Sequence, residues 1–511
     1  MSQIKKINVN GTDYNISLVD GVIDDVLMKD GESVSAAIGN KIDSSAISKV
    51  ATTGSYNDLI DKPTLVTKVE FDKIMSDNAD DWYGIMWTSE NPSPVRVGNM
   101  NFHRNLPIQN GMKRCTLQDN GEVYGYINSA DYTKYDDGRD ADYSGLHGQV
   151  MVEIPEYNFD AVYYTENGVT TNLLKLYPYS KKGKVSKKLY FGAFKASSND
   201  ANSADTNKKL YSICLTNIPV ENGSVNASSL TYLENAPNYR GGNVRTSSDW
   251  DSLESSQLGR PVTSMTRNDF RVRAANRGSG WTQRYWEAAA SIIRLYVVEY
   301  CAFDSQATYY DTPDENGFHR GGLGGGVSTV SSWGDFNNYN PITPCGITIS
   351  LGNNTGVITY QTSSFTTTVP SYRGVECPFG EIWEFTDGIN IYGDSENNKS
   401  LIYTCNDITK FADNTSEGYT LRVDNAQFGT EGWIRNWNWD SNGDFIPTSQ
   451  GGSSSSYLYD YCWFNNPGWK ILVSGGIAYN GAGCGWFYFR AHYGSGDAWA
   501  YAGGRLCYTP Q

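Results

Sequence analysis

Apolar and polar residues alternate on both sides of a two-residue turn near the N-terminus. The turn is Asn10-Gly11, and the alternating apolar positions are Ile7, Val9, Tyr14, Ile16 and Leu18. Asn-Gly favours a tight hairpin turn because both of its residues adopt positive φ at low cost. We therefore predict a β-hairpin over residues 1 to about 20. Residues 21–50 have weak helical character and too few apolar positions to bury a core of their own.

One long helix stands out in the rest of the chain. Within residues 282–300, Tyr285, Ala289, Ile292 and Tyr296 recur at helical spacing, which predicts one apolar face. Residues 66–77 carry apolar residues among charges, a pattern typical of a short helix or a joint between domains. From about residue 81 the apolar runs are short and interrupted by turns. These patterns predict an α+β domain with short strands and many ordered loops.

Composition and charge exclude several classes of protein. The 511 residues include 41 Lys and Arg against 56 Asp and Glu, so the net charge is −15. Such a chain lacks the basic field that binds nucleic acid. Aromatic residues make up 13% of the chain, enough to bury a large core and to exclude bulk disorder. No apolar stretch reaches the length of about 18 residues that spans a membrane, and the first residues lack the apolar segment of a signal peptide.

Cysteine and histidine usage narrows the candidate chemistry. The nine cysteines are scattered and form no CxxC pair, which favours reduced, buried thiols made in a cytosol over a disulfide scaffold or a zinc site. The four histidines lie far apart in the sequence, and HExxH is absent. Glu381, Glu384 and Asp387 resemble a catalytic carboxylate pair only weakly, because strand spacing places residues 381 and 384 on opposite faces. We expect Arg267, Arg271, Arg273 and Arg277 to pair with buried carboxylates such as Glu299.

The segment GSYNDLIDKPT, residues 54–64, carries the first family resemblance. It resembles a short element that recurs in the tail-fibre and tail-tip proteins of tailed bacteriophages, where it lies in a trimeric stalk. This resemblance implies three parts of the chain. Residues 1–50 form an N-terminal segment for virion attachment or oligomerisation, residues 51–80 a short stalk or linker, and residues 81–511 a head.

A second resemblance covers nearly the whole head. It rests on an ordered set of motifs: WYGIMW (82–87), NLPIQNGMKRC (105–115), GQVMVEIPEY (148–157), GRPVTSMTRNDFRVRAANRGSGW (259–281), LYVVEYCAFDSQ (295–306), GGLGGGV (321–327), YRGVECPFGEIWEFTDGINI (372–391) and GGRLCY (503–508). Together they resemble phage tail proteins with a C-type-lectin-like fold of the formylglycine-generating-enzyme type, whose C-terminal ends are diversified by retroelements. The resemblance implies an α+β head of that fold with insertions, preceded by a small β-hairpin and a helical stalk.

The 35 residues Ser474–Tyr508, near the C-terminal end of the head, have the composition of a binding surface. They hold nine Gly and nine aromatic residues but no Lys and one acid. Tyr and Trp offer rigid contact area, and Gly offers an adaptable backbone, as in antibody paratopes. The resemblance assigns Gly475, Gly476, Gly481, Arg505, Leu506 and Cys507 to the fixed scaffold. The candidate ligand-binding residues are Tyr479, Trp486, Tyr488, Arg490, His492, Tyr493, Asp497, Trp499 and Tyr501.

These observations predict a non-catalytic phage receptor-binding protein. Its partners would be a host bacterial surface receptor, either a glycan or a protein, and other phage tail proteins bound through the N-terminus. It would be a homotrimer located in the virion tail and made in the host cytoplasm, without nucleic-acid binding or membrane insertion. We expect no catalytic residue and no cofactor, with a structural divalent cation as an open alternative. The alternative functions are a structural tail-tip or baseplate protein without a receptor, a cysteine-dependent oxidase using Cys462, Cys484 or Cys507, and a glycan depolymerase.

Overall fold

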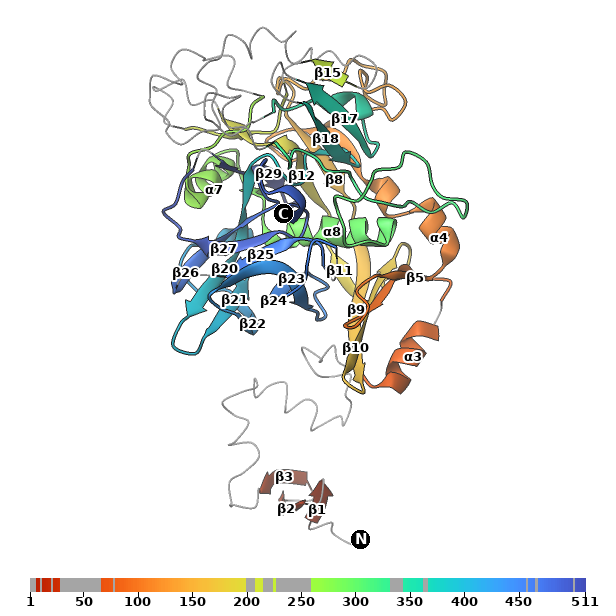
Figure 1. The fold of residues 1–511 in the computed structure, drawn as a ribbon, viewed down its shortest axis with the longest axis vertical. Helices are drawn as coiled ribbons and strands as arrows, with labels where there is room; N and C mark the ends of the chain where they lie inside the picture. The colour runs from red at the N-terminus through yellow and green to blue at the C-terminus, as the bar shows by residue number, and fades with distance from the viewer. Residues whose placement is uncertain are drawn as a thin grey trace. The chain divides into compact units, whose positions relative to one another are not determined.

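The chain divides into two compact units, Met1–Thr64 and Leu65–Gln511. The computed structural model describes residues 6–9, 12–19, 22–27, 66–76, 79–198, 207–214, 224–226, 259–330, 343–361, 366–455, 458–464, 467–499 and 501–511 (Figure 1). The tail-fibre-like segment 54–64 and most of the predicted stalk therefore lie outside the described residues.

The first unit contains a three-stranded antiparallel sheet. Its strands are β1 (Lys6–Val9), β2 (Thr12–Val19) and β3 (Val22–Leu27). Strand β1 pairs with β2 so that Ile7 lies opposite Tyr14, which confirms the predicted hairpin. Strand β3 corrects the weak helical expectation for residues 22–27, because it pairs with β2 as a third strand. Residues 28–50 lie outside the described part.

Most of the second unit is built from antiparallel sheets. One sheet has the order β11 (Lys184–Ser186), β9 (Tyr157–Glu166), β10 (Val169–Tyr177), β4 (Tyr83–Thr88), β5 (Val95–Gly98). Another has the order β16 (Trp281–Gln283), β29 (Arg505–Tyr508), β12 (Leu189–Lys195), β8 (Gln149–Ile154), β6 (Lys113–Leu117), β7 (Val123–Tyr126). Two smaller sheets comprise β13 (Ser197–Ser198) with β14 (Leu210–Tyr211), and β15 (Ser224–Asn226), β17 (Gly356–Gln361), β18 (Thr366–Tyr372) with β19 (Val375–Glu376).

The largest sheet carries the C-terminal segment. Its order is β22 (Thr420–Gln427), β21 (Lys399–Thr404), β20 (Trp383–Asp394), β26 (Gly468–Ser474), β27 (Phe489–Tyr493), β25 (Tyr461–Phe464), β23 (Thr430–Asn438), β24 (Ile446–Gln450), with β28 (Ala502–Gly503) pairing with β20. The end strands approach each other, because Gln450 N donates to Gln427 Oε1 at 3.1 Å. The sheet is thus a nearly closed barrel.

This architecture corrects the predicted fold class. Over the residues that the structure describes, the protein is mostly β-sheet, with 39% in strands and 14% in helices, rather than an α+β lectin-like head behind a helical stalk. The strand signal was weak in the sequence for a physical reason. Strand β12 is buried at every position, and β20 at ten of its twelve, so neither shows the alternation that marks a half-exposed strand.

The structure describes four α-helices in the second unit. They are α3 (Lys68–Ser76), α4 (Met100–Asn105), α7 (Arg267–Ala275) and α8 (Trp286–Tyr300), accompanied by 3-10 turns at Gln109–Gly111, Ile349–Leu351, Ile408–Lys410 and Gly481–Gly483. Helix α3 confirms the short helix expected over residues 66–77. It packs on β9, because Phe71 is buried with its ring 4.6 Å from that of Tyr164. The second half of the predicted 51–80 stalk therefore contacts the large unit.

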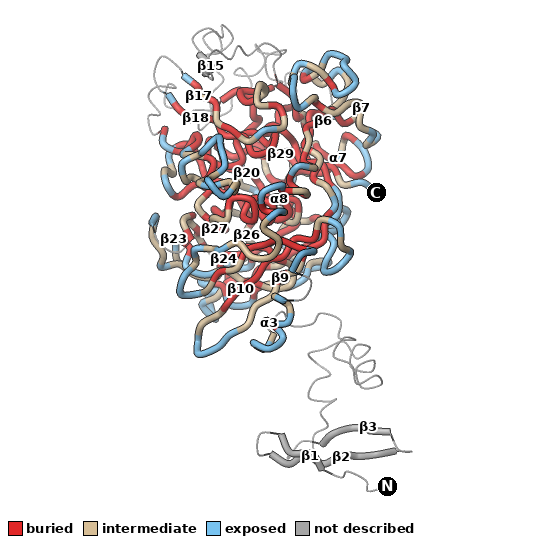
Figure 2. The backbone as a smooth tube through the Cα atoms, turned by 90° about the vertical axis from the view of Figure 1, so that its right-hand side faces the viewer, coloured by how far each residue is buried: buried red, intermediate tan, exposed pale blue. Residues whose placement is uncertain are grey.

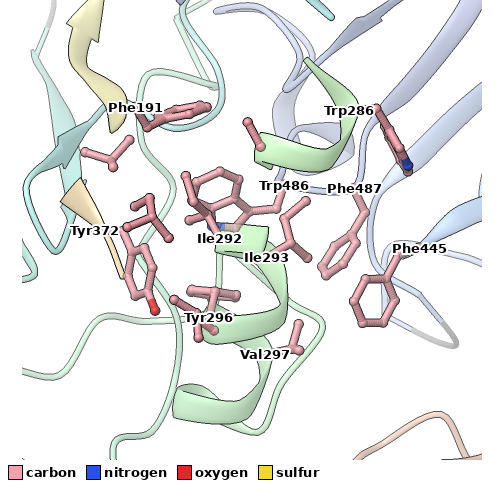
Figure 3. Packing of buried hydrophobic residues seen from close by; sticks show 14 of the residues in the cluster. Phe191, Trp286, Ile292, Ile293, Tyr296, Val297, Tyr372, Phe445, Trp486 and Phe487 are labelled. Atoms are coloured by element: carbon pink, nitrogen blue, oxygen red, sulfur yellow. The ribbon is translucent and has the colours of Figure 1, made fainter. Parts of the chain in front are cut away.

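Helix α8 lies at the centre of the core. It confirms the helix predicted within residues 282–300, although it begins at Trp286 because residues 281–283 pair with β29. All four residues of the predicted apolar face are buried, and the other faces of the helix are buried as well, since every helical residue except Glu287 is buried. Figure 2 shows this burial, and Figure 3 shows core side chains gathered around the helix. A helix surrounded on all sides by protein needs apolar residues all round.

Buried ion pairs connect the sheets to one another. Glu384 of β20 accepts from Arg505 Nη2 and from Lys195 Nζ, both at 2.7 Å, and from Arg284 Nη1 at 3.2 Å. Burial opposes ionisation of Glu384, but these three cations outweigh it and hold its pKa well below the ordinary value. One carboxylate thus joins strands that lie almost two hundred residues apart.

The regularly spaced arginines of α7 and of the residue pair that follows it also form ion pairs and hydrogen bonds, but not with Glu299 as expected. Arg271 Nε donates to Asp387 at 2.6 Å, and Arg267 and Arg277 pair with Asp413 and Asp119. Arg273 donates to Ser198 Oγ at 2.9 Å. Glu299 pairs instead with Arg373, at 2.6 Å. Glu381 accepts from the backbone and hydroxyl of Thr343, so all three carboxylates considered as catalytic candidates have structural partners.

Candidate functional site: a half-buried aromatic face

Strand pairing gathers aromatic side chains from the C-terminal segment on one side of the large sheet. Strand β27 runs antiparallel to β26 and parallel to β25. Along β27, Phe489 and Ala491 enter the core, whereas Arg490 and His492 are half-buried on the other side. This follows from the two-residue repeat of a strand. The register places Trp463 of β25 directly beside Arg490.

A continuous series of ring contacts begins at Trp463. The rings of Trp463 and His492 lie 4.2 Å apart, those of His492 and Tyr493 3.8 Å, and those of Tyr493 and Trp499 3.8 Å. The series ends at Tyr501, whose ring lies 5.8 Å from Trp499 and nearly parallel to it. We call the set Trp463, Arg490, His492, Tyr493, Trp499 and Tyr501 the aromatic face.

The guanidinium of Arg490 organises this face. It lies 4.4 Å from the ring centre of Trp463 and 5.0 Å from that of Tyr493, within the range of cation–π attraction. Its Nε donates to His492 Nδ1 at 3.1 Å. Burial lowers the pKa of His492 to about 4, with Arg490 and Lys470 adding to the effect. His492 is therefore neutral at pH 7, and its Nδ1 acts as the acceptor.

Packing from below makes the face rigid. Trp499 stacks on the buried Phe385 at 6.2 Å between ring centres, and Arg490 also lies over the buried Trp383. Tyr479, the most exposed aromatic residue of the C-terminal segment at 43%, lies at the edge of the face. Burial, with Tyr501 nearby, raises the pKa of Tyr479. Side chains held in this way lose little entropy when a partner binds.

Six of the nine residues proposed from the sequence thus come together: Tyr479, Arg490, His492, Tyr493, Trp499 and Tyr501. Asp497 lies beside them but has a local role, because its carboxylate accepts from Gly494 N at 2.8 Å and closes the intervening turn. Sequence reasoning missed Trp463. The alternation of Tyr461, Cys462, Trp463 and Phe464 was the available signal, since a strand that buries Cys462 and Phe464 presents Trp463 on its other side.

Trp486 and Tyr488, which were expected at the binding surface, are buried. Trp486 is 3% exposed and packs against Tyr296 of α8 and against Tyr372 (Figure 3). Tyr488 is 4% exposed, with its ring 4.6 Å from that of Trp383. Both residues follow Gly485, where the chain passes so close to Asp460 and Ser305 that a Cβ would clash. The chain is thereby directed beneath the surface.

Most of the cysteine side chains are buried. All nine cysteines are free and eight are buried, which confirms the expected buried thiols. Burial raises the pKa of Cys462 to about 12 and that of Cys484 well above its ordinary value, so both thiols are protonated at neutral pH. Over the described residues, no group of three His, Cys, Asp or Glu side chains has the geometry to hold a metal ion.

In the described part of the chain, no helix has the length and apolarity needed to cross a membrane. No protein-family model matches the sequence, and a search of curated proteins finds no significant match.

Proposed function

We propose that this protein is a receptor-binding adhesin of a tailed bacteriophage, which binds a host surface molecule through the aromatic face without catalysing a reaction. The observation that carries the proposal is the cluster of half-buried rings around Arg490. Support also comes from the tail-fibre-like segment 54–64 and the ordered motifs of the head. The proposal does not depend on a lectin-like fold.

The chemistry of the face suits recognition. Tyr, Trp and Arg are the residues enriched at binding hot spots, where a few preorganised side chains carry most of the affinity. The rings of the face offer stacking surfaces, and Arg490 offers further N–H donors beside the one bonded to His492. The resemblance to tail fibres adds attachment to the virion by the N-terminal unit and a homotrimeric assembly. Three copies would raise the avidity of a weak individual site.

Cell binding by a double variant tests this proposal. Tyr479→Ala with Tyr501→Ala removes contact area at the edge of the face without changing its buried supports. We expect fluorescently labelled full-length protein to bind susceptible bacterial strains saturably, and the variant to bind at least about tenfold more weakly. The matched control is Tyr310→Ala with Tyr179→Ala, because Tyr310 is also 43% exposed and both tyrosines lie outside the face.

Two results would contradict the proposal. Equal binding by the double variant and the wild-type protein would remove the face from the interaction. Absence of binding to a broad panel of strains, with all proteins folded, would favour the structural tail-tip function instead.

A further inference from the structure

A second candidate site lies in a cleft between β4, β9 and β10 on one side and β23 and β24 on the other. The cleft has a volume of about 460 Å³, within the range of roughly 300–1,000 Å³ found for small-molecule sites. None of its lining residues belongs to the aromatic face. The strands meet here because Trp439, just after β23, donates its indole N–H to Val162 O of β9 at 3.2 Å.

Three adjacent strands present one row of side chains to the cleft. In the sheet register, Asn172 of β10 lies directly between Trp87 of β4 and Tyr163 of β9. All three side chains line the cleft. A tight two-residue turn joins β9 to β10 beside this row, with Asn167 and Gly168 at positive φ values of 51° and 82°, and Gly168 lines the cleft.

Two polar groups in this row belong to mostly buried residues, yet their polar atoms remain accessible from the cleft. Asn172 is 7% exposed and Trp87 is 4% exposed. Neither the amide of Asn172 nor the indole N–H of Trp87 makes a side-chain hydrogen bond to any residue that the structure describes. Because neither atom is fully enclosed by protein, both can exchange hydrogen bonds with whatever occupies the cleft, water or ligand. Both groups line the cleft, where a ligand would supply a partner.

The opposite wall of the cleft also presents indole rings and asparagine amides. Trp437 lines the cleft, and the ring of Trp439 packs against that of Trp87 at 4.6 Å. Asn436 donates to Ser449 Oγ at 3.1 Å, and Asn438 donates to Asp440, so both amides are held in fixed orientations. In total the lining includes four asparagines, three threonines and one serine around three tryptophans and one tyrosine.

The charge of the lining selects the class of ligand. Arg435 is the one charged residue among those that line the cleft, all of which the structure describes. It already interacts with another residue of this chain, and no Asp or Glu belongs to the lining. The lining therefore lacks the pair of carboxyl groups with which most glycosidases hydrolyse a glycosidic bond. Amide and hydroxyl groups between flat indole rings suit a ligand with many hydroxyl groups and apolar C–H faces.

We propose that this cleft binds a neutral saccharide, with Asn172 and the Trp87 indole donating hydrogen bonds to sugar hydroxyl or ring oxygens and Trp437 contacting a sugar face. The proposal is independent of the function assigned to the aromatic face, because the two sites share no residue.

Ligand-observed saturation-transfer NMR on the full-length protein tests the proposal. The probes are the methyl glycosides of glucose, galactose, mannose and N-acetylglucosamine, with glucuronate and sialic acid as charged comparisons. We expect transfer to at least one neutral glycoside and at least about tenfold weaker binding to Asn172→Leu, which has a similar volume but no amide. Incorporated 5-fluorotryptophan provides a second readout, since indoles in the cleft shift when it is occupied.

Matched variants separate loss of the site from loss of the fold. Thr171→Val is the control, because Thr171 is 8% exposed on the neighbouring position of β10 but lies on the other side of the strand. Its binding should equal that of the wild type. If Asn172→Leu fails to fold, the exposed lining residue Asn425 decides the question, and Asn425→Ala should weaken binding. Absence of transfer to every neutral glycoside, a preference for the charged sugars, or unchanged binding by the folded Asn172→Leu would overturn the proposal.

Discussion

Two aromatic clusters of similar composition behave differently in this protein. The first, around α8, includes Tyr296, Tyr372, Trp486 and Phe487, all buried. The second is the aromatic face, whose members are half-buried. Residues 474–508 contribute to both, so composition does not distinguish a core from a recognition surface. The direction of each side chain relative to α8 and the sheet makes that distinction.

The division occurs within a few residues of the same segment. Trp486 N donates to Ser305 Oγ at 3.2 Å, and Phe487 N donates to Asp460 at 2.7 Å, which draws this stretch beneath α8. Burial raises the pKa of Asp460 well above its ordinary value, although the bond from Phe487 opposes this. Three residues after Trp486 the chain enters β27, where side chains alternate between the core and the surface. Anchoring by two polar groups thus decides which rings become core.

Replacing Glu384 should have the largest effect on the buried side of this comparison. Glu384→Gln leaves Arg505, Lys195 and Arg284 without their shared carboxylate, and breaking a buried ion pair costs about 3–5 kcal/mol. We expect the loss to reach the upper end of that range, measured as the free energy of unfolding in urea. Asp72→Asn is the control, because Asp72 pairs with Lys68 at the surface, and it should change stability by less than about 0.5 kcal/mol. A stable Glu384→Gln protein would contradict the structural importance of this cluster.

Truncating one ring from each cluster tests the comparison directly. Trp486→Ala should lower the free energy of unfolding by about 3–4 kcal/mol, because it leaves a cavity against Tyr296 and Tyr372. Tyr479→Ala should change it by less than about 0.5 kcal/mol, since Tyr479 is 43% exposed. Equal losses in chemical denaturation would show that the two clusters do not differ as the structure indicates.

Two histidines should make the stability of the protein depend on pH. Burial lowers the pKa of His103 and of His492 to about 4, whereas the unfolded chain titrates near 6.5. Between these values the unfolded state binds more protons, so stability falls as the pH drops from about 6.5 towards 4. His103 is 1% exposed and should account for at most about 3 kcal/mol of this loss, and the partly exposed His492 for less.

Urea unfolding at pH 7, 6, 5 and 4 measures these contributions. His103→Gln keeps a donor for Val97 O, which the imidazole contacts at 3.0 Å, but has no proton to gain. It should flatten the pH dependence more than His492→Gln. A slope unchanged by His103→Gln would show that the buried imidazole does not control the acid sensitivity.

The sequence by itself determined the local elements with strong patterns. Alternation around Asn10-Gly11 identified the β1–β2 hairpin, helical spacing identified α8, and the C-terminal composition pointed to six residues that do gather near one face. Each of these signals arises from neighbours in the chain, where periods of 2 and 3.6 residues apply.

Only the tertiary structure decided the fold class, the burial of Trp486 and Tyr488, and the cleft. The parallel pairing of β25 with β27 brings Trp463 to Arg490, and the packing of β23 against β9 brings Trp439 to Trp87. Such contacts join residues up to about 350 positions apart, and no local period records them. Strands buried on both faces also lack the apolar–polar alternation that reveals a strand in a sequence. The sequence alone therefore does not identify these sheets.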